Sequence, residues 1–318
     1  MMTVERYTPA SAAEWDAAVD ASRNGTFLHK RLYMDYHSDR FEDCSLMARD
    51  NAGRIVAVLP AHSDGTTVSS HRGLSYGGWL MSPRADAEAM LEVWRLMTEY
   101  YAGLGFIRLI YKPSPHIFHK YPAEEDLYAL FRAGGQLKST LISSVTDNSA
   151  ILGFDMSARQ SVRKAMKAGV VAGESDCWAE FWDVLSTLLR ERHNAKPVHT
   201  LDEILLLHSR FPSNIRLFTA TCEGRIVAGV VVYVSDTVAH SQYAATTAEG
   251  RSLRALPLLY SHILEEFSSL RYFDYGTSNE DGGLVLNTGL IRQKCGFGAR
   301  AIVYNTYECP LIPPTNHE

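Results

Sequence analysis

Apolar positions recur along this chain with two different spacings. In residues 87–101 and 253–267 they return at every third or fourth position, which puts them on one face of a helix. Short apolar runs typical of strands are "GRIVAVLPA" (53–61), "FIRLIYK" (106–112), "GRIVAGVVVY" (224–233) and "RYFDYG" (271–276). The pattern predicts an α/β fold in which amphipathic helices cover a mixed sheet.

The letters "GRIVA" occur twice, at Gly53 and at Gly224, and the elements around them follow the same order. A helical stretch precedes each copy: "SAAEWDAAV" (11–19) in the first and "CWAEFWDVLSTLLRER" (177–192) in the second. A polar strand end with a histidine follows each, "SSHRG" or "AHSQY", and then a helix and a short strand. This repetition predicts an internal duplication.

A duplicated chain of 318 residues is expected to form two domains, because single cores rarely grow beyond about 250–300 residues. We place the domains at residues 1–150 and 151–318, with the join in the polar stretch "SSVTDNSAILGFDMSA". The alternative boundary is "AGGQ", residues 133–136.

The two copies differ in front of their helices. The second has "TTAEGRSLRAL", where Gly250 would let a phosphate approach the backbone and Arg251 and Arg254 would pair with its oxygens. An exposed turn is the alternative. The first has "MSPRADAEAM", where Ser82 is expected as the N-cap and Pro83 as the first helical residue.

The composition of the chain limits the classes of ligand that it is expected to bind. The chain has 31 Lys and Arg against 36 Asp and Glu, a net charge of −5, which argues against DNA as a ligand gripped by bulk charge. Its five cysteines form no CxxC pair, and two nearby histidines, His116 and His119, lack a third ligand, so we expect reduced thiols and no metal site. There is no signal-like or membrane-spanning apolar run, and a cytoplasmic protein is expected.

The segment "YFDYGTSNEDGGLVLNTGLIRQKCGFGAR" (272–300), with "SHRGLSYGG", "YKPSP" and "RQSVRKAMKAG", resembles the FemAB-like branch of the GNAT acyltransferase superfamily. The resemblance extends from about Trp15 to Tyr307 and implies two tandem GNAT-like domains packed around a central cleft. The implied activity is transfer of an acyl or aminoacyl group to an amine.

The chain departs from relatives at two points. They usually carry an acidic residue where this chain has Cys295, and the helical-hairpin arm of some peptidoglycan bridge enzymes has no counterpart. We therefore expect acyl-CoA, such as acetyl-CoA, as co-substrate, with an amine of a sugar, amino acid or cell-envelope precursor as acceptor. The alternatives are an aminoacyl-tRNA-dependent transferase and a catalytically silent module that binds a glycan or peptide precursor.

Direct transfer to an amine requires a base, an oxyanion site and anchors for both substrates, but no covalent enzyme intermediate. His71 is the expected base in the first domain, because imidazole titrates near neutrality, and Tyr76 is expected beside it as a further catalytic residue that lines the acceptor cleft. Asp274, on the "YFDYG" strand, is the competing candidate, and its alternative is a structural carboxylate.

The remaining candidate residues are expected to bind either the acyl donor or the amine acceptor. The donor set adds two residues of the "HSQY" strand end to the glycine loop: Gly250, Arg251, Arg254, Gln242 and Tyr243. The acceptor set is Lys112, Arg159, Arg163, His193, Ser278, Asn287 and Lys294. A solvated basic helix is the alternative for the two arginines, and a glycine-capped helix end is the alternative for the lysine.

Overall fold

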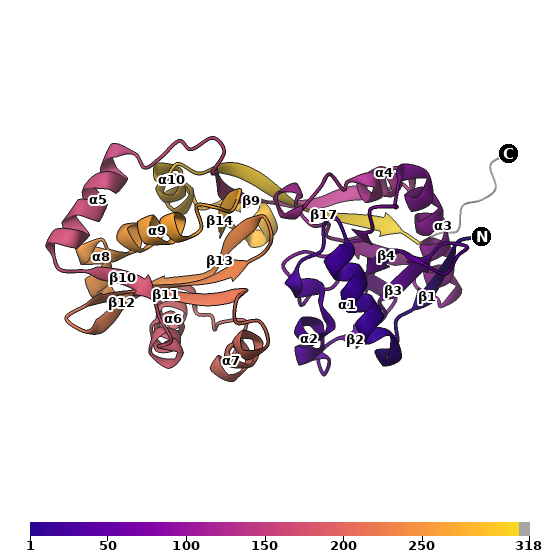
Figure 1. Cartoon of the computed structure of the whole chain (residues 1–318), viewed down its shortest axis with the longest axis horizontal. Helices are drawn as coiled ribbons and strands as arrows, with labels where there is room; N and C mark the ends of the chain where they lie inside the picture. The colour runs from indigo at the N-terminus through magenta and orange to yellow at the C-terminus, as the bar shows by residue number, and fades with distance from the viewer. Residues whose placement is uncertain (312–318) are drawn as a thin grey trace. The chain divides into compact units, whose positions relative to one another are not determined.

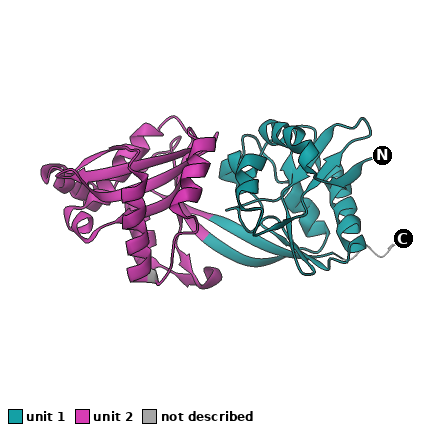
Figure 2. Ribbon diagram, turned by 90° about the horizontal axis from the view of Figure 1, so that it is seen from below, with its two compact units in different colours: residues 1–141, 303–318 teal, residues 142–302 magenta. Residues whose placement is uncertain are grey.

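The computed structural model describes residues 1–311, apart from the side chain of His193. It divides into two compact units, unit 1 (residues 1–141 and 303–318) and unit 2 (residues 142–302), as Figure 2 shows. The boundary thus precedes the expected residue 150, and the C-terminal segment joins the first unit. The chain passes between the units twice, along the strands β9 (Gln136–Asp147) and β17 (Arg300–Pro310).

Unit 1 contains two groups of strands. One is a four-stranded antiparallel sheet in the order β1 (Thr3–Arg6), β3 (Leu46–Arg49), β4 (Ile55–Leu59) and β7 (Leu80–Met81). The other runs from β17 through β8 (Arg108–Tyr111), β6 (Thr67–Ser69) and β5 (His62–Asp64) to β2 (Glu42–Asp43). Its helices are α1 (Ala12–Ala21), α2 (Arg31–Met34), α3 (Ala87–Gly103) and α4 (Glu125–Arg132).

The core of unit 1 forms where α3 covers its strands. Met90, Trp94 and Tyr101 of α3 are buried, as the helical spacing predicts, and they belong to one apolar cluster with Trp79. Cys309, near the end of β17, belongs to the same cluster. This packing, together with the β17–β8 pairing that sets Tyr307 opposite Tyr111, explains why the last segment belongs to unit 1.

One helix start differs from the prediction. Asp86, and not Ser82, caps α3, because its carboxylate accepts a hydrogen bond from the backbone N–H of Ala89 at 2.8 Å. Ser82 instead closes a turn, since its carbonyl accepts from the backbone N–H of Ala85. The start of an amphipathic pattern was visible in the sequence, but several residues there were chemically able to cap it.

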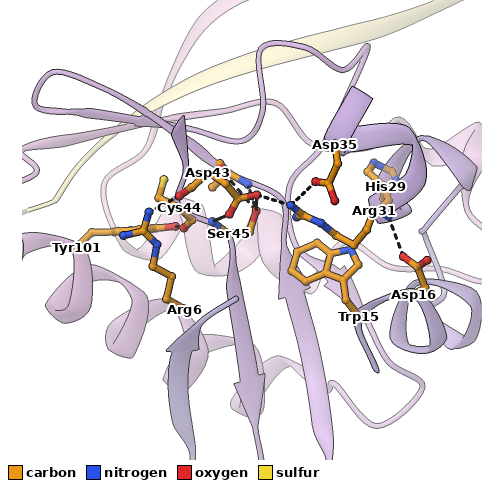
Figure 3. A network of polar contacts seen from close by, with 11 residues as sticks. Arg6, Trp15, Asp16, His29, Arg31, Asp35, Asp43, Cys44, Ser45 and Tyr101 are labelled. Carbon is orange, nitrogen blue, oxygen red and sulfur yellow. Dashed lines mark hydrogen bonds and ion pairs between the residues drawn. The ribbon is translucent and has the colours of Figure 1, made fainter. Parts of the chain in front are cut away.

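A polar network lies beneath α1 and α2 of unit 1 (Figure 3). Arg31 is 6 % exposed, and its guanidinium contacts Asp35 at 2.6 Å and Asp43 at 2.8 Å. It also lies over the ring of Tyr7, 3.8 Å from the centroid. With its charge paired and its plane stacked, this arginine links α2 to β2, and it is a structural feature of the unit.

Unit 2 has a single run of strands covered on both faces. Their order is β10 (Val171–Glu174), β11 (Ile215–Cys222), β12 (Arg225–Val234), β13 (Val238–Thr246), β14 (Tyr272–Thr277) and β9, with a small hairpin of β15 (Asn279–Glu280) and β16 (Val285–Leu286). The helices are α5 (Met156–Lys167), α6 (Trp178–His193), α7 (Leu201–Arg210), α8 (Ala248–Leu253), α9 (Ala255–Glu266) and α10 (Thr288–Gly296). Figure 1 shows α5 and α9 on one face of the sheet and α6 and α7 on the other.

The internal duplication is visible in the strands. β4 and β12 both lie in the repeated "GRIVA" segments, and each is antiparallel to the strand before it. Each unit also holds one parallel pair, β6–β8 in unit 1 and β13–β14 in unit 2, whose second strand follows a long helix. The mixed α/β fold expected from the sequence is confirmed. Among the described residues, no helix is long and apolar enough to cross a membrane.

Candidate active site

The parallel strands of unit 2 separate after a short paired stretch. β13 and β14 are in register only from Val238 opposite Tyr272 to His240 opposite Asp274. Beyond that point β13 continues beside β12, whereas β14 remains beside β9. Among the described residues the β14-facing edge of β13 has no paired strand beyond His240, at the carboxyl ends of two parallel strands, where α/β folds commonly carry their sites.

The carboxylate of Asp274 lies at this branch point and is completely buried. It accepts hydrogen bonds from Ser143 Oγ at 2.5 Å, the backbone N–H of Gly276 at 2.8 Å and His240 Nδ1 at 2.9 Å. Gly276 adopts a φ of 78°, a conformation that glycine takes without strain, and so its N–H can turn back to the carboxylate. Three donors make this a site built to hold a buried carboxylate.

The pair of His240 and Asp274 has the geometry of a general base held by a carboxylate. The Asp274 side chain is 0 % exposed and that of His240 is 17 % exposed, so the imidazole reaches from the buried carboxylate toward solvent. Donation from Nδ1–H to Asp274 makes Nε2 the unprotonated nitrogen of the neutral ring. Such an arrangement can accept a proton and stabilise the imidazolium that results.

Lys294 enters the same site from α10. Its Nζ donates to the carbonyl oxygens of Gly276 at 2.7 Å and Thr277 at 2.8 Å, and to Ser278 Oγ at 3.1 Å. Burial lowers the pKa of this ammonium to about 8, while the charge of Asp274 acts in the opposite direction. The lysine fixes the end of β14 and sets a cation near the buried carboxylate.

The loop after β14 is held by its own polar groups. Ser278 is buried, and its carbonyl accepts from the backbone N–H of Asn287 at 2.9 Å. Asn287 caps α10 by accepting from the N–H of Leu290 at 3.0 Å, and its amide donates to Glu280. Both residues therefore have structural partners, and they position α10 and Lys294.

Comparisons with known proteins agree with this architecture. Residues 156–281 match the family model described as an acetyltransferase (GNAT) domain, and they include both strands of the separating pair. The second unit contains a GNAT acetyltransferase domain. No curated protein sequence matches the chain.

Solved structures extend the likeness to both units. A structure of FemX has a TM-score of 0.68 at 13 % identity, covering 96 % of each chain. A tandem GNAT protein from the clavulanic acid biosynthesis pathway has a TM-score of 0.52 at 13 % identity, covering 99 % of this chain and 100 % of its own. The C-terminal domain of a putative lysylphosphatidylglycerol synthetase from Agrobacterium fabrum has a TM-score of 0.60 at 14 % identity, covering 95 % and 92 %.

These findings confirm the resemblance on which the sequence interpretation rests. The chain has the FemAB-like tandem GNAT fold, and with its acetyltransferase domain it is a GNAT-type acyltransferase. Among the described residues, no group of three or more His, Cys, Asp and Glu side chains is placed to hold a metal ion.

Among the residues expected to bind the acyl donor, the glycine is buried and the two arginines are exposed. Gly250 is buried, and a Cβ built there would lie 2.1 Å from the carbonyl oxygen of Val227, so close packing on β12 requires the glycine. Its N–H donates to Thr247 Oγ1 at 3.0 Å. Arg251 and Arg254 are exposed beside the N-terminus of α9. The arginines and that helix end thus retain the character of an anion site, and the glycine is explained by packing.

Gln242 and Tyr243 are neighbouring donor candidates on β13, but their side chains have different surroundings. Gln242 is the extra residue of a β-bulge, since Ser241 is opposite Val232 and Tyr243 is opposite Val231. Its side-chain Oε1 is buried with no hydrogen-bond partner among the described residues. The hydroxyl of Tyr243 is 2.6 Å from His199 Nδ1, which fixes that ring against the α7 side of the sheet.

The catalytic candidates of unit 1 are buried in a cluster of rings. His71 is 5 % exposed, with its centroid 5.2 Å from that of His37 and 5.4 Å from that of His62. Burial lowers the pKa of His71 well below its ordinary value, and the two neighbouring histidines add to the effect. A base in this position would be neutral but shielded from an acceptor, so the surroundings of His71 favour a packing function.

Two further unit 1 candidates lie close to this region. Tyr76 packs its ring 4.3 Å from that of Phe118, and its hydroxyl donates to Thr26 Oγ1 at 3.3 Å. Lys112 follows β8, where its backbone N–H donates to Ser70 Oγ at 2.8 Å. Burial lowers the pKa of its ammonium. Tyr76 has structural contacts, whereas Lys112 remains a candidate for binding.

The other acceptor candidates lie on helices of unit 2. Arg159 and Arg163 are exposed on α5. His193 ends α6, and its side chain lies outside the described part of the structure. None of the contacts described for these residues links them to Asp274 or Lys294. The structure therefore brings together two of the predicted site residues, Asp274 and Lys294, with Ser278 beside them.

Two functional candidates were missed from the sequence, His240 and Ser143. His240 lies in "AHSQY", which had been singled out as a polar strand end, but nothing in one strand reveals the register of its parallel neighbour. Ser143 reaches the carboxylate from β9, in a stretch interpreted as a join between domains.

Proposed function

We propose that this GNAT-type acyltransferase is an N-acyltransferase that moves an acyl group from acyl-CoA directly to an amine. His240 replaces His71 as the proposed base. The observation that carries the proposal is the contact of 2.9 Å between His240 Nδ1 and the buried Asp274 at the point where β13 and β14 separate.

The separated strands support an acyl-CoA donor. Beyond His240, β13 is paired with no strand on the β14 side among the described residues, and an extended ligand with amide groups can pair with such an edge. The unpartnered Oε1 of Gln242 offers an acceptor for an amide N–H. Arg251 and Arg254, at the N-terminus of α9, supply positive charge for the pyrophosphate.

The reaction follows from these positions. The neutral amine attacks the thioester carbonyl, the new C–N bond forms, and the C–S bond breaks to release the thiolate of CoA, which takes up a proton from solvent to give the thiol. The proton lost by the amine passes to His240 Nε2, and Asp274 stabilises the imidazolium through Nδ1–H. Lys294 holds the Gly276–Ser278 backbone that shapes the β14 side of the site.

A thiol-release assay tests this function. With acetyl-CoA and a panel of amino sugars, amino acids and cell-envelope precursors, His240→Ala is expected to lower kcat by roughly 10²–10⁴-fold, because general base catalysis contributes that much. Asp274→Asn should lower it as well, while both variants still bind CoA. Exposed His116 provides the matched control, and His116→Ala should retain full activity. Unchanged turnover in His240→Ala would refute the assignment of the base.

Aminoacyl-tRNA is the second candidate donor. The observation in its favour is the likeness of fold to a protein named a putative lysylphosphatidylglycerol synthetase. Native mass spectrometry with acetyl-CoA and with charged tRNA separates the two donors. A bound CoA mass supports the first proposal, whereas transfer that is abolished by ribonuclease, with no CoA bound at high concentration, supports the second.

A further inference from the structure

The helix α5 carries an unusual charge pattern for this chain. Its twelve residues include four cations and no acidic residue: Arg159, Arg163, Lys164 and Lys167. The chain as a whole has a net charge of −5. All four side chains are exposed, so the helix presents a concentrated positive surface on an acidic protein.

These cations lack protein counter-ions. Within residues 1–311, none of the four makes an ion pair, although exposed arginines elsewhere do so readily; Arg95 on α3, for example, contacts both Glu92 and Glu99. The carboxylate of Asp155, just before α5, accepts from the backbone N–H of Ala158 at 2.7 Å and caps the helix. An external anion is the partner that this arrangement lacks.

Exposed apolar side chains accompany the charges. Met156 is 70 % exposed and Met166 is 62 % exposed, at the two ends of the helix. Ile151 and Leu152, in the segment before it, are 72 % and 62 % exposed. Buried Ala158 and Ala165 fix the opposite face of α5, which lies beside α9 in Figure 1. The basic side chains and the two methionines therefore belong to the outward face of α5, and the exposed Ile151 and Leu152 lie in the segment just before it.

We propose that this α5 surface, comprising the four cations with Met156, Met166, Ile151 and Leu152, docks on an anionic phospholipid membrane. Basic clusters of this size bind anionic headgroups, and the flanking aliphatic side chains can enter the boundary between headgroups and acyl chains. Surfaces that bind single-stranded nucleic acid commonly add rings on which bases stack, and this set contains no aromatic residue. The inference does not depend on the identity of the acyl donor.

Vesicle co-sedimentation tests the proposal with the full chain. Binding is expected to vesicles of phosphatidylglycerol and phosphatidylcholine, to weaken with salt, and to be absent with phosphatidylcholine alone. The double variant Arg163→Glu/Lys167→Glu should bind roughly tenfold or more weakly. Met156→Ser/Met166→Ser should bind more weakly with its charges intact. The matched control, Arg190→Glu/Arg192→Glu, makes the same charge change on exposed positions of α6 and should bind as the parent does.

Circular dichroism confirms that each variant is folded, and the milder Arg163→Gln/Lys167→Gln replaces any that is not. Equal loss of binding in the α5 and α6 variants would overturn the proposal, because the effect would then follow net charge alone. Failure of the parent to bind the anionic vesicles at low salt would also overturn it. So would α5-dependent binding of a short RNA without vesicle binding, which would make the surface a nucleic-acid site.

Discussion

Burial makes the charge of Lys294 depend on pH in the range where enzymes are assayed. Its pKa falls from 10.5 to about 8 in the folded chain. Between those values the unfolded chain binds more protons than the folded chain, so the stability contribution of this residue rises with pH across that window. Below about pH 8 the charged lysine is retained in the fold at a cost in free energy.

A Lys294→Met variant isolates this effect. Urea unfolding of the parent and of the variant should show the parent gaining stability relative to the variant between about pH 7 and pH 10. The variant should also lose order at Gly276–Ser278, because three acceptors lose their donor. A free-energy difference that is independent of pH would contradict the lowered pKa.

At the scale of single residues, the sequence predicted Asp274 as a site residue but did not predict its partner, His240. Asp274 and Lys294 belong to the segment that resembles known relatives, and they do meet in the structure through the end of β14. His240 is 34 residues from Asp274, and their contact depends on a parallel register that no single strand encodes. His71 had the right chemistry, but its burial among other rings is a property of tertiary packing.

The segment of α8 and Arg254, which precedes α9, has two separable functions. Gly250 packs against Val227 of β12, and Arg251 and Arg254 face outward. Gly250→Ala is expected to destabilise the protein by about 1–3 kcal/mol, because the new methyl group overlaps backbone that cannot easily move. Thermal unfolding measures this loss.

Arg251→Ala/Arg254→Ala supplies the contrasting variant. It should melt as the parent does but bind CoA more weakly, since exposed arginines contribute little to stability and much to phosphate binding. If Gly250→Ala were fully stable and selectively deficient in CoA binding, the glycine would serve the ligand and not the packing.

Whole elements were more predictable than their ends. The apolar period identified α3 and α9, and the repeated letters identified β4 and β12, because burial of one face imposes these patterns directly. The structure has Asp86 as the N-cap of α3, where the sequence predicted Ser82. No sequence pattern indicated the β-bulge at Gln242. Both depend on local hydrogen bonds for which several neighbouring residues can compete.

At the scale of the molecule, the last strand completes the first unit. A chain that ends at Ile302 keeps all of unit 2 but loses the β17 residues that pair with β8 and the Cys309 contact with the core. Hydrogen exchange should then increase in β8, while β11 and β12 remain protected. A chain ending at Leu311 is the control, and unchanged protection of β8 in the shorter chain would contradict this account.

The sequence placed the units approximately but assumed that each was continuous. Polar composition near residue 150 suggested a linker, yet residues 136–147 form a strand, β9, that passes from one unit to the other. The return of the C-terminus to unit 1 depends on strand pairing between residues such as Tyr307 and Tyr111, which local composition does not reveal.

This discontinuity sets an order of assembly during synthesis. The ribosome delivers every residue of unit 2 before it delivers residues 303–310, so the second unit in the sequence is the first whose strands are all present. Unit 1 must wait with this edge of β8 unpaired until residues 303–310 have been made. The proposed catalytic pair of His240 and Asp274 thus belongs to the unit that can mature early, and the N-terminal half is the part of the nascent chain with the greater need for chaperone protection.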